Sequence, residues 1–178
     1  MSVEYGVELV DWKRFQELWA EHGDAGFFHQ AEEEGGADWI IQLGPQPHWQ
    51  ESWKVAIDFS DAFKELRKHL APDERQRFEE FFLAFCLTND RESFVPPRDL
   101  GEEIDEEIFF STISPPTARH YLDLWEKLDM ESLRPAFARI EPEGHMRSFE
   151  HFKRYPEMWA DLLRDAVDKK AGIVLTLA

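Results

Sequence analysis

The stretch from Ser114 to Phe137, SPPTARHYLDLWEKLDMESLRPAF, constrains the fold of this chain more than any other. Ser114 can cap a helix by accepting hydrogen bonds from first-turn amides, and Pro115 suits the first helical position. Apolar side chains then recur at the spacing of one helix face, at Ala118, Tyr121, Leu122, Trp125 and Leu128. The sequence therefore predicts a capped amphipathic helix with Trp125 buried in an aromatic core. The expected partners of Trp125 are Phe82, Phe85 or Trp159.

Short apolar or alternating stretches predict strands, and longer stretches with helical spacing predict helices. The expected strands are residues 5–10, 39–43, 53–59, 108–113 and 173–177. Residues 39–43 and 53–59 are expected to pair as a hairpin. The expected helices begin after Asp11, at Ser60, at Pro72, at Ser114 and near Ser148. Pro156 either bends the last helix or marks its start.

The length of 178 residues fits one domain, residues 1–178, that can bury about 70% of the surface its unfolded form exposes. We expect an α+β fold. It combines a small, mostly antiparallel or mixed sheet of about four to five short strands with about five amphipathic helices. No internal repeat or domain linker interrupts the chain.

The single cysteine, Cys86, excludes an internal disulfide, and its neighbours in FFLAFCL favour a buried thiol in a reducing compartment. The first residues, MSVEYGVELVDWK, lack a basic region followed by an apolar one, so we expect no secretion signal. The longest apolar run, Phe81 to Leu87, has seven residues, far fewer than the ~20 of a membrane-spanning helix. We therefore expect a cytoplasmic protein that does not enter a membrane.

The net charge of -17 would repel nucleic-acid phosphates, so we expect no direct nucleic-acid binding. The acids concentrate in two stretches without any base, residues 31–38 with four and residues 99–107 with six. These stretches are either solvated loops or a docking patch for a basic protein partner. The candidate docking residues are Glu102, Glu103, Glu106, Glu107 and Trp49. Trp49 could instead fold back over the core.

No motif in the chain marks a catalytic, metal or cofactor site. The seven histidines show no HExxH pattern and no CxxC partner, and there is no GxSxG elbow or glycine-rich phosphate loop. Glu65 and His69 lie four residues apart, as ordinary helix-surface pairs do. With 37 acids, spacing alone cannot identify an acid–base pair. We therefore expect no catalytic residue, no metal and no cofactor.

Two hypotheses for function follow. The first is a non-enzymatic acidic interaction module, similar to an immunity or inhibitor protein, that binds a basic partner. The alternative is a small-molecule-binding protein, or an enzyme of unknown reaction, with a cleft where the 88–91 loop meets the start of the 114–128 helix. Helix N-termini favour anions. The candidate polar groups of this cleft are Thr88, Asn89, Arg91 and His120.

The chain resembles the YfbM-like family of uncharacterised bacterial proteins, mainly over residues 78–137 and 157–177. The family carries a motif Phe-Leu-His-Phe-x-Leu-Thr-Gly at the end of a core helix, which is similar to FLAFCLTN at residues 82–89. Further similarity lies in Leu122, Asp123, Leu128, Asp129, Leu133, Arg134, Phe137, Leu163, Arg164 and residues 173–177. Ala84 and Asn89 replace the His and Gly of the motif, so a ligand role of that His does not transfer. The resemblance implies an α+β fold and no known activity.

Overall fold

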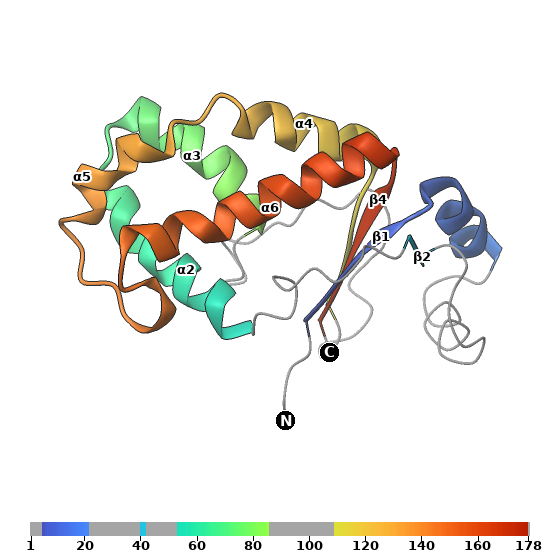
Figure 1. The fold of residues 1–178 in the computed structure, drawn as a ribbon, viewed down its shortest axis with the longest axis horizontal. Coiled ribbons are helices and arrows are strands. Elements are labelled where there is room, and N and C mark those ends of the chain that lie inside the picture. Colours follow the sequence, from blue (N-terminus) through green and yellow to red (C-terminus); the bar gives the residue numbers. More distant parts are fainter. Residues whose placement is uncertain (1–4, 22–39, 42–52, 86–108, 178) are drawn as a thin grey trace. The chain divides into compact units, whose positions relative to one another are not determined.

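The computed structural model describes residues 5–21, 40–41, 53–85 and 109–177 (Figure 1). The chain divides into two compact units whose segments alternate along the sequence. Unit 1 comprises Met1–Gln50, Pro97–Arg119 and Leu163–Ala178, and unit 2 comprises Glu51–Pro96 and His120–Leu162. Unit 1 contains a β-sheet, and unit 2 contains a helical core.

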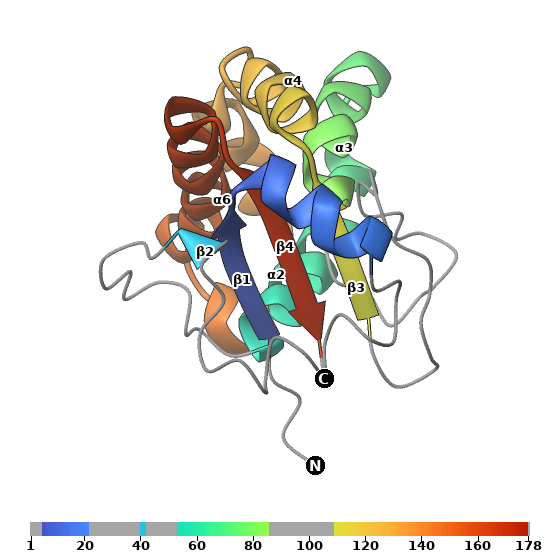
Figure 2. The ribbon, with the colours of Figure 1, turned by 90° about the vertical axis from the view of Figure 1, so that its right-hand side faces the viewer.

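Unit 1 is built on an antiparallel sheet with the strand order β2-β1-β4-β3. The strands are β1 (Tyr5–Val10), β2 (Ile40–Ile41), β3 (Phe109–Ile113) and β4 (Gly172–Leu177). Figure 2 shows β4 between β1 and β3, where Ile173 pairs with Leu9 on one side and with Ile113 on the other. All three side chains are buried. The predicted strand 173–177 is therefore confirmed and lies in the interior of the sheet.

Residues 12–21 form a helix that packs on one face of this sheet (Figure 2). Asp11 caps the helix, because the backbone N–H of Arg14 donates to Asp11 Oδ1 at 3.1 Å, which confirms the predicted start. Trp12 lies so close to Gly172 that a Cβ at position 172 would be 2.2 Å from the indole ring. The missing side chain of Gly172 thus makes room for the tryptophan that covers the start of β4.

Unit 2 is a helical core dominated by aromatic side chains. Its longer helices are α2 (Trp53–Leu66), α3 (Pro72–Phe85), and the parts of α4 (Pro115–Trp125) and α6 (Phe149–Lys169) that belong to the unit. Its short helices are η1 (Arg67–His69), η2 (Met130–Leu133), α5 (Arg134–Phe137) and η3 (Gly144–Met146). Phe59 stacks on Phe152 with ring centroids 4.8 Å apart, and Phe85 stacks on Trp159 at 4.6 Å. These ring contacts join α2 and α3 to α6.

The hairpin predicted from residues 39–43 and 53–59 is wrong. Residues 40–41 pair with β1, and residues 53–59 are the start of helix α2. The buried positions of α2 recur at helical spacing, at Ala56, Phe59, Ser60, Ala62, Phe63 and Leu66. This longer pattern outweighs the short alternation that favoured a strand. Ser60, predicted as a helix cap, is buried inside α2.

The predicted helix start at Ser114 is confirmed. Helix α4 begins at Pro115, and the backbone N–H of Thr117 donates to Ser114 Oγ at 3.4 Å. The predicted environment of Trp125 is wrong, because this side chain is only half-buried and packs on Phe81, with ring centroids 5.3 Å apart. It does not stack on the expected Phe82, Phe85 or Trp159. Trp125 therefore lies at the margin of the aromatic core.

The described residues combine helices with a small antiparallel sheet, the α+β arrangement that the sequence predicts. The sheet has three strands of five or six residues, fewer than the four to five expected, and the two-residue segment β2 beside β1. The difference arises mainly because residues 53–59 are helical. Among the described helices, none is long and apolar enough to cross a membrane.

Candidate functional site

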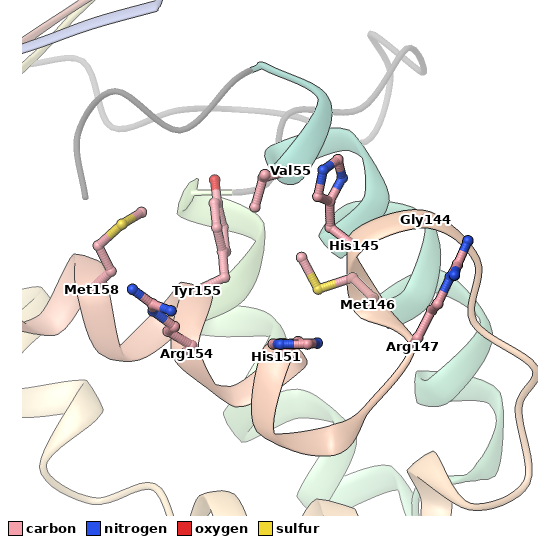
Figure 3. A pocket seen from close by; sticks show the side chains of 9 residues that line it. All are labelled: Val55, Gly144, His145, Met146, Arg147, His151, Arg154, Tyr155 and Met158. Atoms are coloured by element: carbon pink, nitrogen blue, oxygen red, sulfur yellow. The ribbon is translucent and has the colours of Figure 1, made fainter. Parts of the chain in front are cut away.

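Unit 2 contains an open pocket of about 530 Å³ between the first turns of α2, η3 and the first half of α6 (Figure 3). It is lined by Val55, Gly144, His145, Met146, Arg147, His151, Arg154, Tyr155 and Met158. Small-molecule sites commonly have volumes of about 300–1,000 Å³. The pocket is therefore large enough for a small ligand.

One face of helix α6 supplies four of the lining residues. His151, Arg154, Tyr155 and Met158 follow one another at intervals of three, one and three residues, which places them on the same side of a helix. The helix begins at Phe149, and the backbone N–H of His151 donates to Ser148 Oγ at 3.2 Å. Pro156 lies within α6, so it does not mark the helix start.

The apolar part of the lining comes from Val55, Met146, Met158 and the ring of Tyr155. Tyr155 is 5% exposed, and its hydroxyl donates a hydrogen bond to the carbonyl of Phe85 at 2.9 Å. The hydroxyl is therefore engaged in the core, and the tyrosine contributes its aromatic ring to the pocket. The two methionines are unbranched and can adapt to ligands of different shape.

A part-buried carboxylate at the edge of the pocket joins α2 to η3. Oδ2 of Asp58 accepts a hydrogen bond from the backbone N–H of His145 at 2.9 Å and lies 2.7 Å from Nδ1 of the same residue. Oδ1 of Asp58 accepts a hydrogen bond from Lys54 Nζ at 3.1 Å. Only 11% of the Asp58 side chain is exposed. Two contacts to one carboxylate oxygen thus fix both the backbone and the ring of His145.

Gly144 allows η3 to approach this carboxylate closely. Its φ of 62° lies in the left-handed region that favours glycine. A Cβ at this position would lie 2.1 Å from Oδ2 of Asp58. Any other residue would strain the backbone and displace the carboxylate, so Gly144 is required for the contact between Asp58 and His145.

The pKa of Asp58 is lowered from its ordinary value. Burial of the carboxyl opposes ionisation, but hydrogen bonds from His145 and Lys54, together with the charge of Lys54, outweigh this effect. Asp58 is therefore a carboxylate near neutral pH. Since a carboxylate only accepts hydrogen bonds, Nδ1 of His145 is the donor in this pair.

Four side chains of the lining are basic. They are the guanidinium groups of Arg147 and Arg154 and the imidazoles of His145 and His151. Among the described residues, the lining includes no aspartate or glutamate. The basic character of the lining contrasts with the acidic character of the whole chain, which has 37 acids and 20 lysines and arginines. Clustered positive charge in a concave site favours an anionic ligand.

The site residues predicted from the sequence do not coincide with this pocket. His120 lies exposed on α4, where its ring contacts Tyr121. The other predicted site residues, Thr88, Asn89, Arg91, Trp49, Glu102, Glu103, Glu106 and Glu107, lie outside the described residues. The cleft near the 88–91 loop and the acidic docking patch for a basic protein therefore stay predictions.

Sequence reasoning missed the pocket because its parts are distant in the chain. Asp58 and His145 are 87 positions apart, and no local pattern indicates that they meet. A weaker signal was present in the last helix, where His151, Arg154 and Met158 share one face. A basic and apolar face on a helix of an acidic protein could have indicated a binding surface.

In the ranges that the structure describes, no three His, Cys, Asp or Glu side chains are placed to hold a metal ion. No protein-family model, curated protein or solved structure matches the chain significantly. The resemblance to the YfbM-like family stays a prediction. The geometry of the pocket is therefore the basis for a functional proposal.

Proposed function

We propose that this protein binds a small amphiphilic anion in the pocket between α2, η3 and α6. The ligand would carry a carboxylate or phosphate head and a short apolar body. The observation that carries the proposal is the composition of the lining, whose described residues combine two arginines and two histidines with apolar side chains and include no aspartate or glutamate.

The head group would interact with Arg147, which is exposed and lines the pocket. A guanidinium group presents two parallel N–H donors that match the oxygens of a carboxylate or phosphate. Arg154 and His151 line the pocket from α6 and add positive charge or hydrogen-bond donors. Both head groups share this chemistry, so the experiment must distinguish them.

The apolar body would pack on Val55, Met146 and Met158. Each CH₂ group that leaves water contributes about 0.8 kcal/mol to binding. A short alkyl chain therefore adds useful affinity, whereas an inorganic anion would use only the basic part of the lining. The lining thus favours an amphiphile over a simple ion.

Isothermal titration calorimetry with four probes tests this proposal. We expect octanoate or octyl phosphate to bind, inorganic phosphate to bind more weakly, and octyltrimethylammonium not to bind. The stronger of the first two identifies the preferred head. Arg147→Gln should weaken binding of that probe about tenfold or more, because a hydrogen bond to a charged group contributes about 1.5–3 kcal/mol.

Arg139→Gln is the matched control, because Arg139 is also exposed in unit 2 but does not line the pocket. Both substitutions change the net charge equally, so an effect of overall charge would appear in both variants. Equal losses in the two variants, or equal binding of the anionic and cationic octyl probes, would contradict the proposal.

A further inference from the structure

The contact between Asp58 and His145 at the edge of the pocket narrows the class of ligand. We propose that His145, with Asp58 as its positioning residue, accepts a hydrogen bond from a hydroxyl group of the bound ligand. The preferred ligand is then a hydroxylated amphiphilic anion, such as a hydroxy acid with a short alkyl chain. This inference rests on the proposed function and adds one requirement, a hydroxyl donor.

The contact with Asp58 determines which ring nitrogen can act as an acceptor. Oδ2 of Asp58 lies 2.7 Å from Nδ1 of His145, and the carboxylate has no proton to donate. Nδ1 therefore carries the proton, and the neutral ring has its lone pair on Nε2. The hydrogen bond made by one ring nitrogen generally decides the protonation of the other.

The other polar groups at the pocket are mainly donors. Arg147 and Arg154 have only N–H groups, and the Tyr155 hydroxyl donates to the carbonyl of Phe85. Lys54 donates to Asp58. His151 also lines the pocket, and no contact among the described residues shows which of its ring nitrogens carries the proton. A ligand hydroxyl can accept from an arginine, and its proton then needs an acceptor, which Nε2 of His145 supplies.

Anchoring of η3 alone does not account for the second contact made by Asp58. The backbone N–H of His145 donates to Oδ2 at 2.9 Å, and this bond would form with almost any side chain at position 145. The ring contact to the same oxygen is specific to histidine. The pair therefore orients the imidazole in addition to holding the backbone.

The first arm of the test needs no ligand. Two-bond ¹H–¹⁵N correlation spectra of the full chain at about pH 8.5 show which ring nitrogen of His145 carries the proton. We expect Nδ1–H for His145, the opposite of the form that free histidine favours. Asp58→Ala should release the ring to the usual form. A proton on Nε2 of His145 in the unmodified protein would overturn the inference.

The second arm compares octanoate with 2-hydroxyoctanoate and 3-hydroxyoctanoate, which share its head and chain. We expect at least one hydroxy acid to bind about threefold to tenfold more tightly than octanoate, the ratio that one hydrogen bond contributes. His145→Phe should abolish this preference, measured as the ratio of the hydroxy acid and octanoate affinities within the variant. Asp58→Asn retains an oxygen for both His145 donors and should keep most of the preference.

His69→Phe is the control, because His69 is exposed in unit 2 and does not line the pocket. Octanoate binding without a preference for either hydroxy acid would overturn this inference and leave the proposed function standing. Failure of octanoate and octyl phosphate to bind would instead overturn the proposed function, so the two failures are distinguishable.

Discussion

Two groups of charged side chains meet at helix α6 and differ in composition. In the first, Lys153 Nζ lies 3.1 Å from a carboxylate oxygen of Glu131 and 3.7 Å from those of Glu150 and Glu157. Arg134 joins this network at 2.8 Å from Glu131 and 2.9 Å from Glu150. Each base of the network therefore has acidic partners within the protein.

The pocket is the second group, and the described residues of its lining include bases but no aspartate or glutamate. Asp58 lies at the edge of this pocket, and its carboxylate is engaged by Lys54 and His145. The two groups are close in sequence, because Lys153 belongs to the network and Arg154 lines the pocket. Neighbouring positions of one helix thus belong to two different surroundings, a network of ion pairs on one side and a basic pocket lining on the other.

The largest effect on stability is expected from Gly144→Ala. The new Cβ would lie in a left-handed backbone conformation and would displace the Asp58 carboxylate. We expect a loss of about 2–4 kcal/mol in the free energy of unfolding, measured by urea denaturation.

Glu143→Ala is the control, since Glu143 is exposed and makes no side-chain capping bond. It should change stability by no more than about 0.5 kcal/mol. Equal effects of the two substitutions would show that the pocket edge does not depend on the Gly144 conformation. The Lys153 network has no comparable backbone requirement in the described residues.

The pH dependence of stability separates the two groups further. The pKa of Asp58 is lowered in the folded state, so its contribution is present above the unfolded value of about 3.9 and is lost as the pH falls through the folded value. Below about pH 4, the unfolding free energy of the Asp58→Asn variant should therefore decrease less steeply with falling pH than that of the unmodified protein. The measurement is urea unfolding over a pH series in about 1 M salt, which screens exposed pairs.

The pKa values of Glu131 and Glu150 are also lowered, and the largest cause is in each case a hydrogen bond from Arg134. Their contributions have the same sign and pH window as that of Asp58. Because these side chains are exposed, salt should remove most of their effect. If the unfolding free energy of the unmodified protein no longer falls at acid pH in high salt, Asp58 makes no measurable contribution to its pH dependence.

The smallest effect is expected from Glu131→Gln. This substitution removes the carboxylate shared by Arg134 and Lys153, but Glu150 remains near both bases. We expect a slight loss of thermal stability at low salt and none at high salt, measured by the melting temperature. Octanoate affinity should stay unchanged. A loss of binding equal to that of Arg147→Gln would abolish the distinction between the two groups.

Local sequence signals predicted much of the fold. The caps Asp11 and Ser114 act on amides three residues away, and both are confirmed. The start of α3 at Pro72 and the strand at 109–113 also follow from local signals. Such features depend on neighbouring residues, so the chain itself encodes them.

Features that depend on distant residues were harder to predict. The stretch 53–59 alternates like a strand, and only the longer burial pattern through Leu66 favours a helix. The pocket requires α2, η3 and α6 to come together, and the decisive contact joins residues 58 and 145. A histidine and an aspartate so far apart carry no pairing signal in a single sequence.

Tyr155 connects the pocket to the end of another helix. Its ring lines the pocket, and its hydroxyl donates to the carbonyl of Phe85, the last residue of α3. The last carbonyls of a helix have no partner within it, so Tyr155 closes the final turn of α3. The final turn of α3 and the pocket wall should therefore open as one cooperative unit, and a ligand on the Tyr155 ring would slow amide hydrogen exchange in both.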